Sequence, residues 1–274
     1  MTETAHPEGW DTLADTGRGG PWHWRDGQLV HAAATDRPRE SPDAGWKSRV
    51  RWLVVRNVYA THNKSRTVRE ALDRVLRRLD GGGWGLNLGA GFTRIHPRMV
   101  TIDVMNAANI DIVTDGSVLP LRENSLELVV AQEVLEHIAD FQGTIDEVHR
   151  ALRAGGVFYC QVPFQIGKHH GPMDYWRFSR DALEHLFENE DWSIEEMRIS
   201  LGHGTGFYRI AVEYGAVTAS CLWSRLYLPA KTFFALALIP FRWLDVLTLR
   251  SPEADRIAAG YLVVARKRGA DPTA

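Results

Sequence analysis

Trp84-Gly85-Leu86-Asn87-Leu88-Gly89-Ala90-Gly91 is the stretch that decides the fold, because an apolar run ends there on two glycines one residue apart. A short apolar run of this kind predicts a buried strand. The glycines predict a tight turn, since glycine has no Cβ and tolerates a positive φ. Such a turn brings bare backbone N–H groups close to a ligand. The sequence therefore predicts a ligand-binding turn at the end of a core strand.

Further apolar runs follow this turn in the order of a nucleotide-binding sheet. The run Met99–Ile102 ends on Asp103, where such sheets place an acidic residue that accepts hydrogen bonds from ribose hydroxyls. The later runs are residues 111–114, which end on Asp115 and Gly116, residues 126–131, which lead into Gln132 and Glu133, and residues 157–162, which follow a helix ending at Gly155. Strands that alternate with helices predict an α/β fold.

At this point residues 65–190 resemble the class I S-adenosylmethionine-dependent methyltransferases, in particular the group called methyltransferase type 11. The resemblance implies a Rossmann-like, seven-stranded, mostly parallel sheet with helices on both faces and S-adenosylmethionine as cofactor. It implies that the glycine turn lines the methionine part, that Asp103 holds the ribose and that Asp115 meets the adenine. The cofactor-binding residues implied in this way are Asn87, Gly89, Ala90, Gly91, Asp103, Val104, Asp115, Gly116, Gln132 and Glu133.

The chain departs from the family pattern beside the glycine turn. Asn87 stands where the family usually has an acidic residue, and Thr93 stands where a third glycine is frequent. An amide can still accept a hydrogen bond from the cofactor's ammonium group, but without the charge. The nine residues Phe92–Val100 are too few for a helix followed by a strand, so we expect a short loop or a single turn.

Composition and charge are those of a globular enzyme that does not bind nucleic acid. The chain has 274 residues, 45% hydrophobic and 24% charged residues and a net charge of −2. Cys160 and Cys221 lie far apart, and we expect both to be core thiols in a reducing cytoplasm. No secretory signal opens the sequence, and no His or Cys stands at zinc-ligand spacing, so we expect a cytoplasmic protein without a metal.

The predicted domain organisation is an N-terminal extension over residues 1–64, a methyltransferase domain over 65–268 and a tail over 269–274. The extension is partly irregular in composition but holds four tryptophans, so it either folds over the active-site mouth or packs outside the domain. Apolar spacing predicts a helix from Thr67 to Leu79, capped by Ser65. The Lys and Arg excess from Lys47 to Leu79 is either a solvated face or attracts a phosphorylated or membrane-bound partner.

Substrate-side residues gather after the fifth strand, in residues 163–178, and in the segment that follows Glu133. In the resembling family this region faces the cofactor's methyl group and the substrate. We expect His170, and after it His169, to be the catalytic base. The residues expected to bind substrate are His137, Asp174, Tyr175 and Arg177. Two alternatives remain open. Asp174 and Arg177 can instead pair with each other to brace the loop, and His137 can be a structural residue, as can Glu136 beside it.

A helical, apolar insertion over about residues 204–250 precedes the last strand, residues 260–265. Its ten residues between Lys231 and Arg242 are too few to span a bilayer. A core helix, a homodimer contact through residues 223–247 and an in-plane membrane helix with peripheral membrane contact remain open, and we favour core packing or self-association.

These features favour methyl transfer to a small-molecule acceptor. The favoured target is a hydroxyl of a sugar or secondary metabolite, which can be free or linked to a lipid or nucleotide. One alternative keeps the cofactor and methylates carbon or nitrogen with a coupled cyclisation in natural-product biosynthesis. Another is a catalytically silent cofactor-binding scaffold subunit. The sequence does not identify the acceptor.

Overall fold

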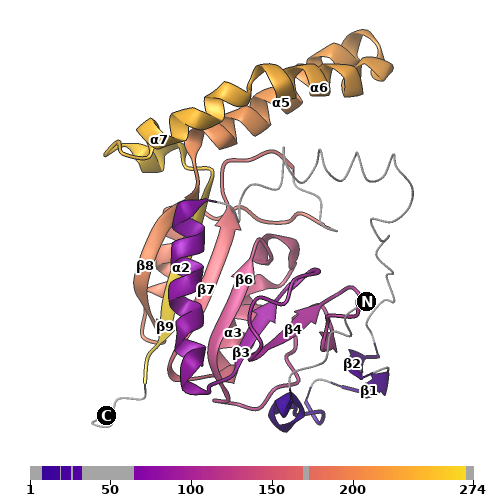
Figure 1. Cartoon of the computed structure of the whole chain (residues 1–274), viewed down its shortest axis with the longest axis vertical. Coiled ribbons are helices and arrows are strands. Elements are labelled where there is room, and N and C mark those ends of the chain that lie inside the picture. The colour runs from indigo at the N-terminus through magenta and orange to yellow at the C-terminus, as the bar shows by residue number, and fades with distance from the viewer. Residues whose placement is uncertain (1–7, 19, 26, 33–64, 169–172, 270–274) are drawn as a thin grey trace.

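The computed structural model describes residues 8–18, 20–25, 27–32, 65–168 and 173–269. In these residues a single mixed sheet forms the body of the molecule, with helices on both of its faces, and a group of helices extends over one end (Figure 1). The expected α/β architecture is therefore confirmed.

The described sheet has nine strands in the order β1-β2-β5-β4-β3-β6-β7-β9-β8. The block from β2 to β7 is parallel, whereas β1 and β9 run antiparallel to their neighbours. The strands are β1 (Trp22–Arg25), β2 (Gln28–His31), β3 (Gly85–Leu88), β4 (Met99–Asp103), β5 (Ile112–Val113), β6 (Leu126–Gln132), β7 (Leu152–Pro163), β8 (Trp192–Leu201) and β9 (Gly260–Lys267). The parallel strands end at one edge, where open α/β sheets bind ligands.

Two strands more than the expected seven come from the N-terminal segment. The hairpin β1–β2 extends the sheet, with Leu29 of β2 paired to Ile112 of β5. Leu29 and Val30 are buried, and the Gln28 side chain donates hydrogen bonds to the carbonyls of Ala107 and Ile110 at 2.8 Å. Part of the predicted extension thus belongs to the sheet, because burial of two apolar side chains and a satisfied amide outweigh the irregular composition around them.

The helix α2 (Arg66–Leu76) lies on one face of the sheet, and α3 (Phe141–Ala151) lies on the other (Figure 1). As predicted, the Ser65 hydroxyl accepts a hydrogen bond from the Val68 amide at 3.2 Å and caps α2, which continues as the 3-10 turn η4 (Arg77–Gly81). The buried stripe of α2 packs in one core cluster with residues of β4, β6, β7 and β9. The α3 stripe packs in a second cluster with the other side of the sheet.

The predicted insertion is helical and extends beyond the sheet. It contains α5 (His203–Leu222), η6 (Ser224–Leu226), α6 (Tyr227–Ala237), η7 (Ile239–Leu244) and α7 (Asp245–Thr248). After it, η8 (Ala254–Ile257) leads into β9. The other helical elements are α4 (Arg180–Phe187) and η5 (Leu135–His137) beside the sheet and η1 (Trp10–Leu13) near the N-terminus. Figure 1 shows α5, α6 and α7 over the end of the sheet at which β6 and β7 finish. None of the helices in the described ranges has the length and hydropathy of a bilayer-spanning segment.

The two cysteines differ in burial. Cys160 lies in β7 and is buried, as expected of a core thiol. Cys221 is exposed, so the same expectation is wrong for this residue. The reason is its place near the end of α5, in the part of the chain that extends beyond the sheet.

Candidate cofactor and acceptor site

The glycine turn after β3 adopts the backbone geometry that its residues allow. Gly89 has φ 65° and Gly91 has φ 58°, both in the left-handed region that favours glycine. The Ala90 amide donates to the Ile102 carbonyl at 3.0 Å, so the turn stays joined to β4. A Cβ on Gly89 would lie 2.4 Å from Cγ2 of Val134. The segment after β6 therefore packs directly against this turn.

Asp103 at the end of β4 fixes the second half of the turn. Its Oδ2 accepts a hydrogen bond from the Gly91 amide at 2.8 Å, and its Oδ1 accepts one from the Met105 amide at 3.0 Å. Asp103 is buried, and Val104 after it is half-buried. Each carboxylate oxygen has a second lone pair, so Asp103 can accept further hydrogen bonds from a ligand.

A loop joins the glycine turn to β4, as the short spacing predicts. The buried Asn87 side chain donates to the Thr93 carbonyl at 3.2 Å, which turns its amide nitrogen toward the loop. The Arg94 guanidinium donates to both Asp111 oxygens, at 3.1 and 2.9 Å. Arg94 and Asp111 thus tie the loop between β3 and β4 to the residue before β5, a structural role that the sequence patterns do not indicate for either residue.

After β5, Asp115 and Gly116 lie in a turn at the same edge of the sheet. The Asp115 Oδ1 atom accepts hydrogen bonds from the Ser117 amide at 3.0 Å and from its hydroxyl at 2.6 Å, and the Asp115 side chain is exposed. Gly116 has φ 84°. Asp115 is therefore presented to solvent on the edge at which Asp103 ends β4.

Glu133 follows β6 in a strained conformation. Its φ is 57°, which is uncommon for a residue with a side chain, and such conformations cluster at functional sites. The Glu133 amide donates to the Gln161 carbonyl at 2.8 Å. The Gln161 side chain accepts from Gln132 at 3.2 Å and donates to Glu133 at 3.4 Å. These bonds hold Gln132 and Glu133 where β6 and β7 finish.

Glu136 is a fully buried acid at the same strand end, and sequence reasoning did not place it in the site. Neither of its carboxyl oxygens has a hydrogen-bond partner among the described residues. Burial, followed by the nearby charge of Glu133, raises the pKa of Glu136 well above its usual value. The apolar neighbours Leu135 and Ile138 were the only sequence signal of this burial.

The Glu136 backbone and His137 connect this segment to residues 173–176. The Glu136 carbonyl accepts hydrogen bonds from the Tyr175 amide at 2.8 Å and from the Trp176 amide at 3.3 Å. His137 Nδ1–H donates to the Met173 carbonyl, and His137 Nε2 lies 3.6 Å from the Glu136 carboxyl. A neutral His137 ring that donates through Nδ1 keeps its lone pair on Nε2.

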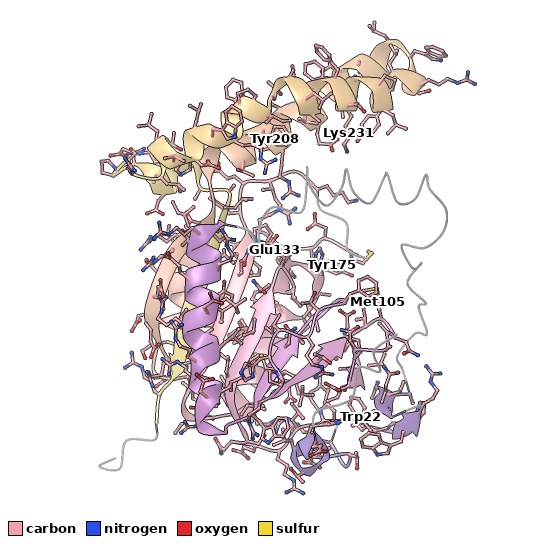
Figure 2. All side chains as sticks on the ribbon, in the orientation of Figure 1. Trp22, Met105, Glu133, Tyr175, Tyr208 and Lys231 are labelled. Carbon is pink, nitrogen blue, oxygen red and sulfur yellow. The ribbon has the colours of Figure 1, made fainter. Side chains whose placement is uncertain are left out.

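Asp174 and Arg177 pair with each other. The Arg177 guanidinium donates to Asp174 at 2.5 and 2.7 Å and to the Gly167 carbonyl at 3.1 Å. The pair therefore joins the two ends of the loop that carries His169 and His170. Both histidines lie outside the described residues. Figure 2 shows Tyr175 near Glu133, between the end of the sheet and the helices above it.

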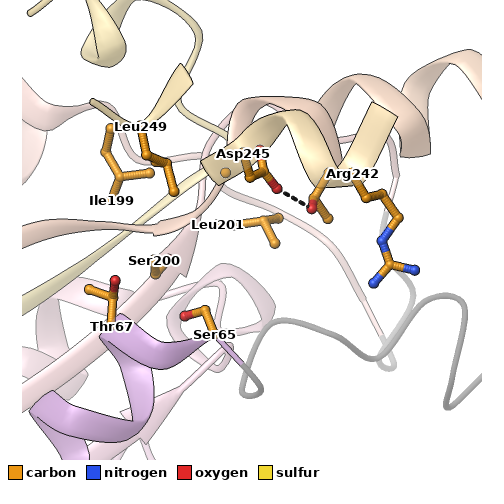
Figure 3. Close-up of a pocket in the computed structure, with 10 residues that line it drawn as sticks. Ser65, Thr67, Ile199, Ser200, Leu201, Arg242, Asp245 and Leu249 are labelled. Atoms are coloured by element: carbon orange, nitrogen blue, oxygen red, sulfur yellow. Dashed lines mark hydrogen bonds between the residues drawn. The ribbon is translucent and has the colours of Figure 1, made fainter. Parts of the chain in front are cut away.

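A hollow of about 400 Å³ lies away from these residues, between the start of α2, the end of β8 and the insertion (Figure 3). None of the predicted site residues lines it. At its rim, Asp245 accepts hydrogen bonds from the Gly204 amide at 2.7 Å and from the Thr205 hydroxyl at 2.6 Å. Asp245 thereby ties α7 to the start of α5.

Comparison with known proteins points to one family. Residues 91–160 match the family described as "Methyltransferase domain". A protein of Mycolicibacterium smegmatis, described as a probable S-adenosylmethionine-dependent methyltransferase, is 29% identical over 103 residues, which are 35% of this chain and 40% of that protein. The chain thus spans well under half the length of this curated relative.

Similar solved structures include a putative methyltransferase in complex with the Haloferax volcanii Trm112 activator, with a TM-score of 0.47, 18% identity and coverage of 85% of this chain and 100% of that one. They also include a putative sarcosine dimethylglycine methyltransferase from Galdieria sulphuraria, with a TM-score of 0.44, 14% identity and coverage of 73% and 88%. The [4+2]-cyclase SpnF has a TM-score of 0.44, 15% identity and coverage of 87% and 88%.

Proposed function

We propose that this chain, which carries a class I S-adenosylmethionine-dependent methyltransferase domain, transfers a methyl group to a hydroxyl of a small-molecule acceptor. A sugar or a secondary metabolite, free or linked to a lipid or nucleotide, is the favoured acceptor. The observation that carries the proposal is the glycine turn fixed by Asp103, next to the strained Glu133 at the adjacent strand end.

The residues at the sheet edge fit the cofactor. Asp103 can accept hydrogen bonds from ribose hydroxyls while it holds the Gly91 and Met105 amides. Asp115 is exposed on the same edge and suits the adenine amino group. The Asn87 amide nitrogen is used by the loop, so its oxygen is the atom that suits the ammonium group. The remaining residues that we assign to the cofactor are Gly89, Ala90, Val104, Gly116, Gln132 and Glu133.

Bound S-adenosylmethionine supplies a methyl carbon that is already electrophilic, because it is attached to a sulfonium. The protein has to hold the acceptor oxygen in line with that carbon and exclude water. A hydroxyl acceptor would have to give up its proton to a base of the protein on methylation. We assign this proton to His170 first and to His169 second.

Anchors on both sides of residues 169–172 support this assignment. Arg177 holds the Gly167 carbonyl before the segment, and the Glu136 carbonyl holds the Tyr175 amide after it. Both anchors lie near the ends of β6 and β7. His137 and Tyr175 are the side chains that we assign to acceptor binding. Asp174 and Arg177 support the chain on either side of residues 169–172, and we assign them to acceptor binding through this support.

The test is incubation of the purified protein with methyl-labelled S-adenosylmethionine and a panel of hydroxylated acceptors, with products identified by mass spectrometry. An O-methylated product is expected, and His170→Ala should lose most of the turnover at unchanged cofactor affinity. His185→Ala, on the exposed face of α4, is the matched control and should keep full turnover. Near-normal turnover by His170→Ala would remove the base assignment, and cofactor binding without any methylated product would favour a scaffold subunit.

A further inference from the structure

The outer surface of residues 203–249, called the helical arm below, is covered with exposed apolar side chains. They are Phe207, Ile210, Tyr214, Val217, Leu222, Trp223, Leu228, Phe233, Leu236, Phe241, Trp243, Leu244, Val246, Leu247 and Leu249. Soluble proteins rarely expose so many large apolar side chains in one region, and such a region marks an interaction surface. The arm is therefore not the core helix that the sequence left open.

Each arm helix has one covered face and one uncovered face. Phe207, Ile210, Tyr214 and Val217 recur three and four residues apart, so they share one face of α5. The other face packs on α6, where the Tyr208 hydroxyl donates to the Ala235 carbonyl at 3.1 Å. The apolar stripe of α5 thus points away from its helical neighbour.

Both acidic residues of the arm have partners within it. Glu213 forms an ion pair with Lys231 and accepts a hydrogen bond from the Tyr227 hydroxyl at 2.7 Å. Asp245 accepts hydrogen bonds from the Gly204 amide and the Thr205 hydroxyl. No acidic side chain of the arm is left to pair with an outside cation.

Two arginines near the apolar surface have no acidic partner among the described residues. They are Arg225 beside the Trp223 ring and Arg250 directly after the arm, whereas Arg242 lies beside the buried Tyr208 ring and lines the hollow of Figure 3. The surface therefore combines apolar side chains, tryptophans and uncompensated positive charge. These are the features of helices that lie in the interface of an anionic bilayer.

A second copy of this chain fits the same surface less well. In a two-fold dimer the same patch meets itself, so the unpaired arginines of both copies would lie in one interface. No free acid on the arm would offset that repulsion. Anionic lipid headgroups offset it directly, since they attract basic side chains near the surface.

The arm also lies next to the candidate site. The start of α5 packs against the chain that leaves β7, because a Cβ on Gly206 would lie 3.3 Å from the Gln165 carbonyl oxygen. Figure 2 shows Tyr208 and Lys231 of the arm above Glu133 and Tyr175. A bound arm therefore lies next to the end of the sheet that carries the site.

We propose that the helical arm docks in the plane of an anionic lipid membrane, with its apolar face among the acyl chains and Arg225 and Arg250 at the headgroups. The arm then holds the enzyme at a bilayer without a membrane-spanning helix. Binding is independent of methyl transfer, so it can be measured without an acceptor.

Flotation of the full chain with vesicles in a density gradient tests this proposal, because aggregated protein sinks and only vesicle-bound protein floats. The vesicles are phosphatidylcholine alone or an equal mixture with phosphatidylglycerol. The wild type should float with the anionic vesicles and at least about tenfold less with the neutral ones, and added salt should weaken the binding.

Two variants separate the apolar part of the surface from the charged part. Phe233→Ser with Leu236→Ser changes two exposed side chains and should lower anionic-vesicle binding about tenfold or more. Arg225→Glu with Arg250→Glu should have a similar effect at low salt. The control is Trp24→Ser, which removes a half-exposed tryptophan from β1 at the far end of the sheet and should bind like the wild type (Figure 1).

The proposal would be overturned if the wild type stayed at the bottom of the gradient with anionic vesicles. It would also be overturned if both arm variants floated with these vesicles as well as the wild type does. Analytical ultracentrifugation gives a second decisive result. A concentration-dependent dimer that the Phe233→Ser/Leu236→Ser variant converts to monomer, without flotation of either protein, would assign the arm to self-association instead.

Discussion

The substitution Gly89→Ala tests the turn on which the proposed cofactor site is built. At φ 65° a residue with a Cβ costs about 1–2 kcal/mol relative to glycine. The added Cβ would also lie 2.4 Å from Cγ2 of Val134, and overpacking of this kind costs about 1–3 kcal/mol. We therefore expect Gly89→Ala to lower the free energy of unfolding by about 2–5 kcal/mol.

Two other glycines separate these contributions. Gly82 has φ 93° with nothing within 4 Å of the position that a Cβ would take, so Gly82→Ala should show the backbone cost alone, about 1–2 kcal/mol. Gly81 has open space and no positive φ, and Gly81→Ala should change the stability by less than about 0.5 kcal/mol. In Gly89→Ala/Val134→Ala the overlap is relieved, so the double variant should be more stable than additivity predicts.

Urea denaturation followed by circular dichroism measures the stability of the wild type, of these four variants and of the Val134→Ala single variant that the additivity test needs, and calorimetry with S-adenosylmethionine reports the site. Gly89→Ala should also weaken cofactor binding, whereas Gly81→Ala and Gly82→Ala should not. If Gly89→Ala were as stable as Gly81→Ala, or if Val134→Ala gave no rescue, the packing of the turn against the segment after β6 would be wrong.

Hydrogen bonds from Arg18, Arg150 and the Leu119 amide outweigh the effect of burial and lower the pKa of Glu147 to about 2. Glu147→Gln should therefore cost about 1–2 kcal/mol at pH 7, after allowance for solvent screening, and almost nothing near pH 2, as urea titrations across pH can show. Burial and the Glu133 charge raise the pKa of Glu136, so the contribution of Glu136 to stability should become unfavourable as the pH rises above the ordinary carboxyl range. Glu136→Gln should therefore gain more stability over the wild type at pH 7.5 than at pH 4. An equal gain at both pH values would contradict this. Cys221 is exposed and Cys160 is buried, where burial raises its thiol pKa, so a thiol reagent should modify one cysteine in the folded protein and the second only after unfolding.

Local patterns in the sequence predicted the central part of the fold. The Ser65 cap, the apolar spacing of α2 and the apolar runs that end on Gly89 and Asp103 each depend on residues close together in the chain. Such patterns act over one helical turn or one strand, which is why single-sequence reasoning finds them.

The pairing of β2 with β5 could not be predicted in the same way. Leu29 and Ile112 are neighbours in the sheet but distant in sequence, and the two-residue β5 has no periodicity of its own. Cys221 shows the same limit, because nothing in its sequence spacing distinguished it from the core thiol Cys160, whereas the structure exposes it. Apolar spacing identifies a helical face but not what covers that face.

The candidate site was only partly visible in the sequence. Asp103 stood out because it ends an apolar strand, at the position where nucleotide-binding sheets place an acidic residue. The left-handed φ of Glu133 and the unpartnered carboxyl of Glu136 depend on how β6 meets β7 and residues 173–176. These features arise from tertiary contacts that no motif encodes.

Calorimetric titration with S-adenosylmethionine and with its demethylated product tests the central claim most directly. The wild type should bind both with one site per chain, and Asp103→Ala should lose at least about tenfold in affinity because it removes the proposed ribose acceptor and the Gly91 anchor. Asp73→Ala, which removes an exposed carboxylate from α2, is the control and should keep wild-type affinity. A folded wild type that binds neither compound, or an Asp103→Ala variant with unchanged affinity, would contradict the assignment of this sheet edge as the cofactor site.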